Sequence, residues 1–120
     1  MTTVYWIAAV PLALFYLYGG GVKLVRGRED LLPMMAWVDT MPMSRVRALG
    51  VVEVLGAAGL VLPPPTGVAP GLAPAAALGF VVLQIGAIRV HLRGRDRDVA
   101  LNVTLLLVAA VAAWAATTWW

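Results

Sequence analysis

Residues 99–118 read VALNVTLLLVAAVAAWAATT and contain no Asp, Glu, Lys or Arg. A helix of about 20 mostly apolar residues is long enough to cross the hydrocarbon core of a bilayer. Two other stretches, 1–22 and 54–88, are equally free of charged residues. A chain of 120 residues has too little interior to hide three such runs from water. The sequence therefore predicts a protein that is surrounded mainly by lipid.

The overall composition agrees with this prediction and excludes several kinds of site. Only 12% of the residues are charged, whereas a soluble domain has roughly 25%. The chain has no Cys, which excludes disulfides, thiolate chemistry, iron–sulfur clusters and Cys-based zinc sites. With His91 as the only histidine, we expect neither a metal site nor a bis-histidine haem.

The chain divides into four segments of membrane-spanning length. Residues 63–71, PPPTGVAPG, cannot be helical throughout because proline lacks the backbone N–H and clashes with the preceding turn. The first segment has no basic residues ahead of it, so we expect it to remain as a helix rather than to be cleaved as a signal peptide. The sequence thus predicts one all-α domain over 1–120, a four-helix transmembrane bundle, with helices at about 3–25, 43–62, 72–92 and 99–118.

The basic residues predict the orientation of this bundle. All nine lie in or beside the first and third connections, and none lies near the termini or the Pro-rich connection. Short loops that are rich in Lys and Arg stay on the cytoplasmic side. We therefore expect a multi-pass protein of the cytoplasmic membrane with both termini outside, whose basic loops contact anionic lipid head groups rather than nucleic acid. The nine residues are Lys23, Arg26, Arg28, Arg45, Arg47, Arg89, Arg93, Arg95 and Arg97.

Aromatic residues near the two ends of the chain fit the same topology. Amphipathic rings prefer the membrane–water interface, so we expect the aromatic residues at these ends to lie at the outer interface. They are Tyr5, Trp6, Trp114, Trp119 and Trp120.

The first connection mixes charges with large apolar residues. We expect Pro33 to open a short interfacial helix in this cytoplasmic loop, because proline is favoured at the first helical position. Leu32, Met35 and Trp37 would then face the lipid boundary. The alternative is a lid that contacts a substrate.

Six polar side chains fall inside the predicted spans, where such groups are costly and usually face the bundle interior or a water-filled cavity. Tyr16 and Lys23 are seven residues apart and share a helical face, and the same spacing joins Gln84 and His91. Glu53 and Gln84 are each expected at a depth of roughly 13 Å from the cytoplasmic side, at 1.5 Å per residue. We expect a buried polar cluster in the cytoplasmic half, formed by Tyr16, Lys23, Glu53, Gln84, His91 and Asn102.

Each of these residues also has a purely structural interpretation. Lys23 can be a basic anchor at a helix end, and Glu53 can pair with Lys23 or with an arginine. His91 can be an interfacial polar residue, while Gln84 and Asn102 can form hydrogen bonds between helices. We expect the glycines of the first two helices to be packing positions that let helices approach closely. They are Gly19, Gly20, Gly50, Gly56 and Gly59.

Three blocks of sequence carry a resemblance to a known family. They are YLYGGGVKL at 16–24, RALGVVEVLGAAGLVLP at 47–63 and GAIRVHLR at 86–93. In this order they resemble the DoxX-like family of small four-helix membrane proteins. The positions that match the family pattern are Gly20, Lys23, Gly50, Glu53, Gly59, Pro63, Ala87 and His91. The resemblance implies a four-helix bundle, but relatives range from a membrane subunit of a thiosulfate:quinone oxidoreductase to a chaperone of receptor assembly.

Three functions remain open at this point. The first is an accessory or assembly subunit without catalysis, which binds a membrane protein partner or a second copy of the chain. The second is a quinone- or lipid-binding subunit of a membrane oxidoreductase that uses Lys23, Glu53, Gln84 and His91; no cofactor motif is evident, and a quinone is the cofactor that would fit. The third is a proton-transfer enzyme acting on an isoprenoid-like substrate, with Glu53 as the candidate catalytic acid or base.

Overall fold

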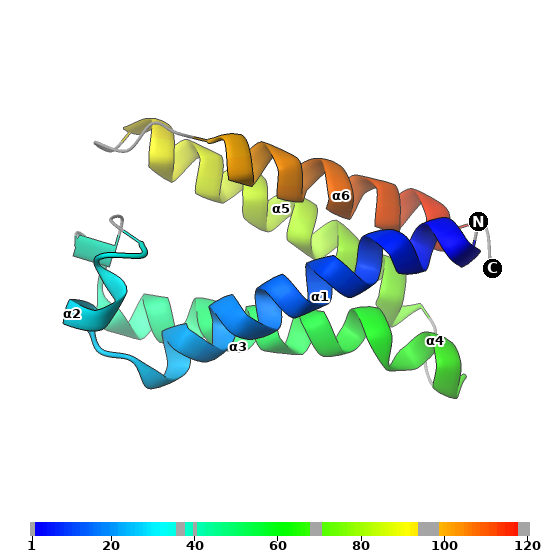
Figure 1. Cartoon of the computed structure of the whole chain (residues 1–120), viewed down its shortest axis with the longest axis horizontal. Coiled ribbons are helices and arrows are strands. Elements are labelled where there is room, and N and C mark those ends of the chain that lie inside the picture. Colours follow the sequence, from blue (N-terminus) through cyan, green and yellow to red (C-terminus); the bar gives the residue numbers. More distant parts are fainter. Residues whose placement is uncertain (1, 36–37, 40, 68–70, 94–98, 118–120) are drawn as a thin grey trace.

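The fold is a bundle of four long helices with two short ones between them (Figure 1). The computed structural model describes residues 2–35, 38–39, 41–67, 71–93 and 99–117. The all-α prediction is confirmed: 88% of the described residues are helical, and none of them lies in a strand. The long helices begin and end within one residue of the predicted ranges. In chain order the helices are α1 (Thr2–Val25), α2 (Arg28–Leu31), α3 (Met43–Val61), α4 (Pro63–Thr66), α5 (Leu72–Arg93) and α6 (Ala100–Thr117).

The four long helices form a closed ring of neighbours. Helix α1 packs against α3 and α6, and α5 packs against the same two helices. The direction alternates along the chain, so both termini lie at the end that carries α4, while α2 lies at the opposite end (Figure 1). At that opposite end the pair α1/α3 diverges from the pair α5/α6.

Glycines set how closely α1 and α3 approach each other. A Cβ atom on Gly20 would lie 2.8 Å from the carbonyl oxygen of Gly50, and a Cβ atom on Gly50 would lie 2.8 Å from the carbonyl oxygen of Gly20. Real Cβ atoms essentially never come this close to another atom. Only glycine fits at these two positions, which is typical of helices that pack backbone to backbone in membranes.

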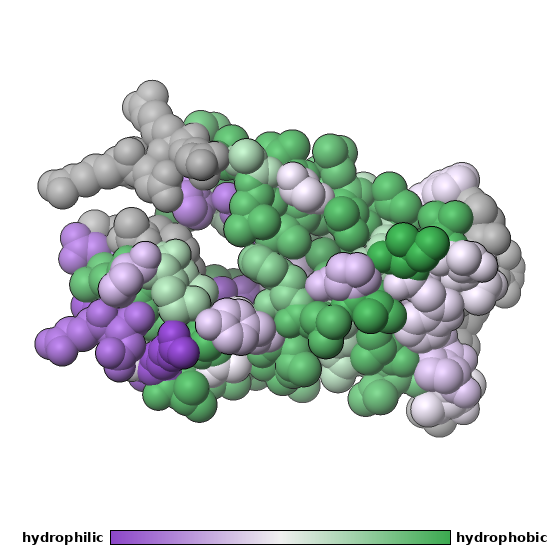
Figure 2. Space-filling model, in the orientation of Figure 1, coloured by the Kyte–Doolittle hydropathy of each residue, from purple (hydrophilic) through white to green (hydrophobic). Residues whose placement is uncertain are grey.

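The helix surfaces match a membrane environment. Helices α1, α5 and α6 are long and apolar enough to cross a membrane. Helix α3 differs because it holds three ionisable residues, Arg45, Arg47 and Glu53, within its 19 residues. On the face shown in Figure 2, apolar side chains cover the middle of the bundle, and hydrophilic side chains gather at the end that carries α2. The chain thus has the surface of a membrane protein, because lipid is the solvent that favours such an apolar band.

The prediction that Pro33 opens a helix in the first connection is wrong. The short helix α2 ends at Leu31, ahead of the proline. Pro33 has no N–H for the carbonyl of Glu29, so the helix cannot continue through it. The connection packs onto the end of the bundle, where Leu31 and Val38 are fully buried. Trp37, which we expected to face lipid, lies outside the described residues.

The prediction that Tyr5 anchors the outer interface is also wrong. Tyr5 is 0% exposed, and its hydroxyl donates a hydrogen bond of 2.5 Å to the carbonyl of Leu60. In an uninterrupted helix that carbonyl would accept from residue 64, but Pro64 has no N–H. Tyr5 therefore supplies the donor that the Pro-rich connection lacks. Trp6 is half-buried and Trp114 is exposed, while residues 119 and 120 lie outside the described part of the chain.

Candidate functional site

A cavity of about 630 Å³ lies between the two helix pairs. In the space-filling view the molecule is hollowed near α2, where the pairs diverge (Figure 2). Most of the wall is apolar, with side chains such as Phe15, Leu49 and Leu83. All six polar residues of the predicted cluster line this one cavity: Tyr16, Lys23, Glu53, Gln84, His91 and Asn102. The structure therefore brings together residues that are up to 86 positions apart in the sequence (16 to 102).

The first polar element of the wall is an ion pair between α1 and α3. The Lys23 ammonium donates to both carboxylate oxygens of Glu53, and the distance from Nζ to Oε2 is 2.7 Å. The two side chains are only 8% and 3% exposed. A buried charge needs a partner, since an uncompensated charge in an apolar medium is strongly unfavourable. Among the partners that the sequence allowed for Glu53, the structure thus has Lys23 rather than an arginine.

The backbone around Lys23 is held in place by an arginine of α3. One guanidinium nitrogen of Arg47 donates to the carbonyl oxygen of Lys23 at 2.5 Å and to that of Arg26 at 2.6 Å. These carbonyls belong to the last turn of α1 and its continuation, where oxygens have no partner within the helix. A cation at a helix C-terminus also interacts favourably with the helix dipole. Arg47 therefore fixes the end of the helix that positions the Lys23 ammonium.

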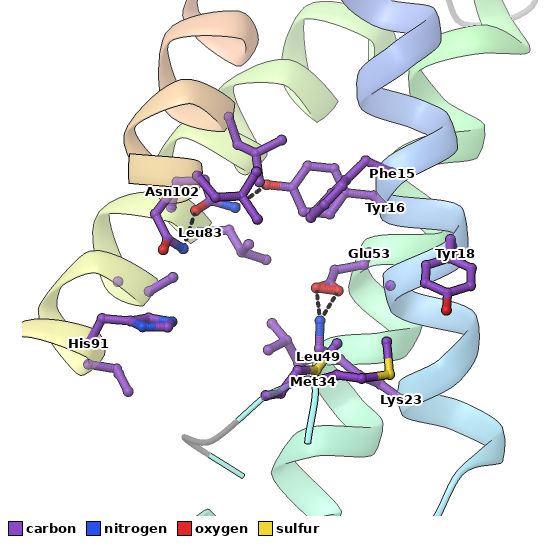
Figure 3. Close-up of a pocket in the computed structure, with 18 of the residues that line it drawn as sticks. Phe15, Tyr16, Tyr18, Lys23, Met34, Leu49, Glu53, Leu83, His91 and Asn102 are labelled. Atoms are coloured by element: carbon purple, nitrogen blue, oxygen red, sulfur yellow. Dashed lines mark hydrogen bonds and ion pairs between the residues drawn. The ribbon is translucent and has the colours of Figure 1, made fainter. Parts of the chain in front are cut away.

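The second polar element is a chain of hydrogen bonds that joins α1, α5 and α6. The Asn102 Nδ2 group donates to Gln84 Oε1 at 3.0 Å, and Gln84 Nε2 donates to the Tyr16 hydroxyl. Gln84 and Tyr16 are buried, whereas Asn102 is half-buried. These are the interhelical hydrogen bonds that buried amides favour in a membrane. Figure 3 shows this chain on the opposite side of the cavity from the Lys23–Glu53 pair.

The ring of Tyr16 is fixed by packing as well as by this chain. It stacks on Phe80 with a centroid distance of 3.9 Å and an interplanar angle of 7°. The Phe80 ring in turn lies against Gly56, where a Cβ atom would be 2.5 Å from Cζ. Gly56 and Gly59, which lies against Ala76 of α5, therefore bring α3 close to α5. Gly19 differs from these two glycines, because a Cβ atom on it would lie 3.9 Å from the Lys23 Nζ, an ordinary contact distance.

His91 is the sixth polar residue that lines the cavity. Its side chain is half-buried, lines the cavity wall on α5 and lies on the same helical face as Gln84. In the close-up its ring lies across the cavity from Glu53 (Figure 3). The residues of the predicted cluster therefore surround one mostly apolar space.

Comparison with known proteins identifies the family. The model of the DoxX-like family matches residues 7–114, which is most of the chain. The chain belongs to the DoxX-like family. No curated protein and no solved structure was found to match it. Both polar elements and His91 lie within the matched residues.

Several residues of this DoxX-like protein line the cavity although the sequence did not predict it, and one of them, Met35, was expected to face the lipid boundary. Met34, Met35 and Met41 of the connection between α1 and α3 line the cavity next to the ion pair. Flexible thioether side chains adapt to ligands of different shape. Three methionines within eight residues are the one sequence signal for this wall, and periodicity could not reveal it because the described residues of that stretch form no α-helix.

The polar groups of the site can orient a ligand within an apolar space. The ion pair carries no net charge, and the amide chain and the Tyr16 hydroxyl offer directed hydrogen bonds. A few placed polar groups in a mostly apolar pocket are typical of small-molecule sites. The cavity of this DoxX-like protein can hold an apolar body and fix one polar end.

Proposed function

We propose that this DoxX-like protein binds a lipid-soluble ligand with a polar head in the cavity between its helix pairs. The cavity of about 630 Å³, with six polar residues on apolar walls, is the observation that carries this proposal. Its volume lies within the range of roughly 300–1,000 Å³ that is typical of ligand sites. A quinone or a membrane lipid has the required combination of apolar body and polar head.

The proposal includes a fourth membrane span by α3. This helix packs against both α1 and α5, which are themselves long and apolar enough to cross. Its 19 residues give a length of about 28 Å, close to the roughly 30 Å of a bilayer core. The Lys23 ammonium compensates Glu53, and both arginines of α3 lie in its first turns. The three charges are therefore compatible with a membrane-spanning α3.

The orientation follows from the end at which the basic residues lie. Described basic side chains from the first connection and from the last turns of α5 belong to the end that carries α2, opposite the termini (Figure 1). We place this end in the cytoplasm, with both termini outside, in the cytoplasmic membrane. Anionic head groups would then surround the cavity end of the bundle.

Ligand binding is favoured over the other two functions by the cavity. The accessory or assembly role, with a membrane protein partner or a second copy, stays a prediction that does not account for the polar groups on the cavity wall. A proton-transfer role for Glu53 also stays a prediction. In the structure both carboxylate oxygens accept from Lys23, so the carboxylate is engaged before any substrate arrives.

A cavity-filling substitution tests the proposal. Ala87 is half-buried in the cavity wall on α5, whereas Ala75 is exposed on the same helix and does not line the cavity. We expect the purified wild-type protein to retain one lipid-soluble molecule, which mass spectrometry of an organic extract identifies. Ala87→Phe should lower its amount about tenfold, and Ala75→Phe should not change it. Retention of only bulk lipids, in membrane proportions and equally in all three proteins, would contradict the proposal.

A further inference from the structure

The hydrogen-bond chain of the cavity ends in an unused donor. The Tyr16 hydroxyl accepts from Gln84, and within the described part of the chain its own hydrogen is donated to no acceptor. Tyr16 is 1% exposed and lines the cavity. A buried donor without an acceptor is costly, so this hydroxyl favours an acceptor that arrives in the cavity.

The surplus donor does not depend on how the two amides are turned. Rotating both amide groups of Gln84 and Asn102 reverses the chain, so that Tyr16 donates to Gln84 and Gln84 donates to Asn102. The unused N–H groups then belong to Asn102, which also lines the cavity. In either direction the chain presents a donor to the cavity, because it contains more N–H and O–H groups than its two internal hydrogen bonds consume.

We propose that the Tyr16–Gln84–Asn102 chain recognises a ligand by an acceptor oxygen of the carbonyl class on its polar head. This inference rests on the proposed ligand-binding function and specifies the head group. A ring ketone of a quinone and an ester carbonyl of a glycerolipid share this chemistry, since both accept a hydrogen bond and donate none. We place the tail of the ligand along three apolar lining residues, Phe15 of α1 and Leu101 and Leu105 of α6. Leu101 is 58% exposed.

Rigid placement of the hydroxyl makes it a selective donor. The ring is held by stacking on Phe80 at 3.9 Å and by an edge contact with Phe15 at 5.4 Å. A donor that is fixed before binding does not lose rotational freedom when the ligand arrives. Tyr18 offers the contrast, because it also lines the cavity but is 58% exposed.

The experiment compares three probes on three proteins. The probes are decylubiquinone with ring carbonyls, dioctanoylglycerol with ester carbonyls, and decylbenzene, which has no oxygen. The proteins are the wild type, Tyr16→Phe and the control Thr104→Val, which removes an exposed hydroxyl of α6 that does not line the cavity, in dodecyl maltoside, with binding followed by native mass spectrometry. Tyr16→Phe should weaken at least one carbonyl probe about fivefold to tenfold, the value of one hydrogen bond, and change decylbenzene by less than about twofold. Thr104→Val should bind all probes like the wild type.

The outcomes show which kind of ligand supplies the carbonyl, and they test the carbonyl inference separately from the proposed function. A loss for decylubiquinone alone identifies a quinone, and a loss for dioctanoylglycerol alone identifies a lipid ester. Equal binding of every probe to wild type and Tyr16→Phe, together with an unshifted carbonyl stretch of the bound probes on the wild type, overturns the carbonyl inference but leaves the proposed function standing. If no probe binds the wild type, the proposed function fails with it. Infrared spectra of ¹³C-carbonyl probes on the wild type give a second measurement that needs no variant: the carbonyl stretch should shift to lower frequency on binding, and an unchanged stretch overturns the inference.

Discussion

The backbones of Gly20 of α1 and Gly50 of α3 lie so close together that neither residue has room for a Cβ atom. A Cβ atom on either residue would lie 2.8 Å from the carbonyl oxygen of its partner. The contacted atoms are backbone, which cannot move aside without separating the helices. Lys23 and Glu53 each follow one of these glycines by three residues, and because the two helices run antiparallel, they lie on opposite sides of the contact along the helix axes (Figure 1). The contact therefore sets the distance between the helices that their ion pair bridges.

The first prediction is that Gly20→Ala destabilises the bundle. We expect a loss of about 2 kcal/mol, typical of an overpacked core position, measured as the unfolding midpoint in detergent. The neighbouring Gly21 provides the control, because a Cβ atom there meets nothing within 4 Å. Gly21→Ala should be neutral or stabilising by up to about 1 kcal/mol, because alanine has the higher helix propensity. Equal effects of the two substitutions would contradict the close-contact explanation.

The second prediction concerns the hydrogen bond from Tyr5 to the carbonyl of Leu60. Tyr5→Phe removes the donor and leaves the ring, so we expect a loss of about 1–3 kcal/mol, the cost of an unsatisfied buried carbonyl. Thermal unfolding followed by circular dichroism measures it. Tyr18→Phe removes an exposed hydroxyl and should have no effect.

A compensating substitution tests the reason for that bond. Pro64→Ala returns an N–H group to the position from which a helix would supply Leu60. In the Pro64→Ala background, Tyr5→Phe should therefore cost less than it does in the wild type. An undiminished cost would show that the proline is not the reason for the bond.

The sequence predicted the helices better than their contacts, and α1 shows why. Charge-free runs and prolines decide where a membrane helix begins and ends, because both act locally. Our prediction for Tyr5 was wrong because it considered the residue type and not the helical face on which the residue lies. Tyr5, Leu12 and Tyr16 follow one another at spacings of seven and four residues and are all buried, so helical periodicity could have placed Tyr5 in the core.

The candidate site was predictable only as a set of residues. The depth estimates for Glu53 and Gln84 placed them at one level, and both line the cavity. Their division into an ion pair and an amide chain depends on which helices are neighbours in the ring, and no local pattern specifies that. The methionine wall depends on how the connection folds back over the bundle, which is again a tertiary property.

The third prediction is that the Lys23–Glu53 pair behaves as a unit. Glu53→Leu removes the countercharge of the buried Lys23 ammonium, and Lys23→Met leaves the carboxylate in the same position. Each single substitution should cost about 3–5 kcal/mol of stability, whereas the double variant Lys23→Met/Glu53→Leu should lie within about 1 kcal/mol of the wild type. Arg89→Met, at an exposed position of α5, is the control and should change stability little. Additive costs in the double variant would show that the two charges are not coupled.

The fourth prediction is the topology, which single cysteines can report without background because the chain contains none. Glu29, Thr66 and Thr117 are exposed positions before α3, after α3 and at the end of α6. With a membrane-impermeant maleimide on intact cells, Thr66→Cys and Thr117→Cys should be labelled. Glu29→Cys should be labelled only after the membrane is permeabilised, because the proposed orientation places its loop in the cytoplasm. The comparison of Glu29→Cys with Thr66→Cys decides whether α3 crosses, since labelling of both from one side is incompatible with a fourth span. If the two variants are labelled from opposite sides but Glu29→Cys is labelled on intact cells, the protein has four spans and its orientation is the reverse of the one proposed.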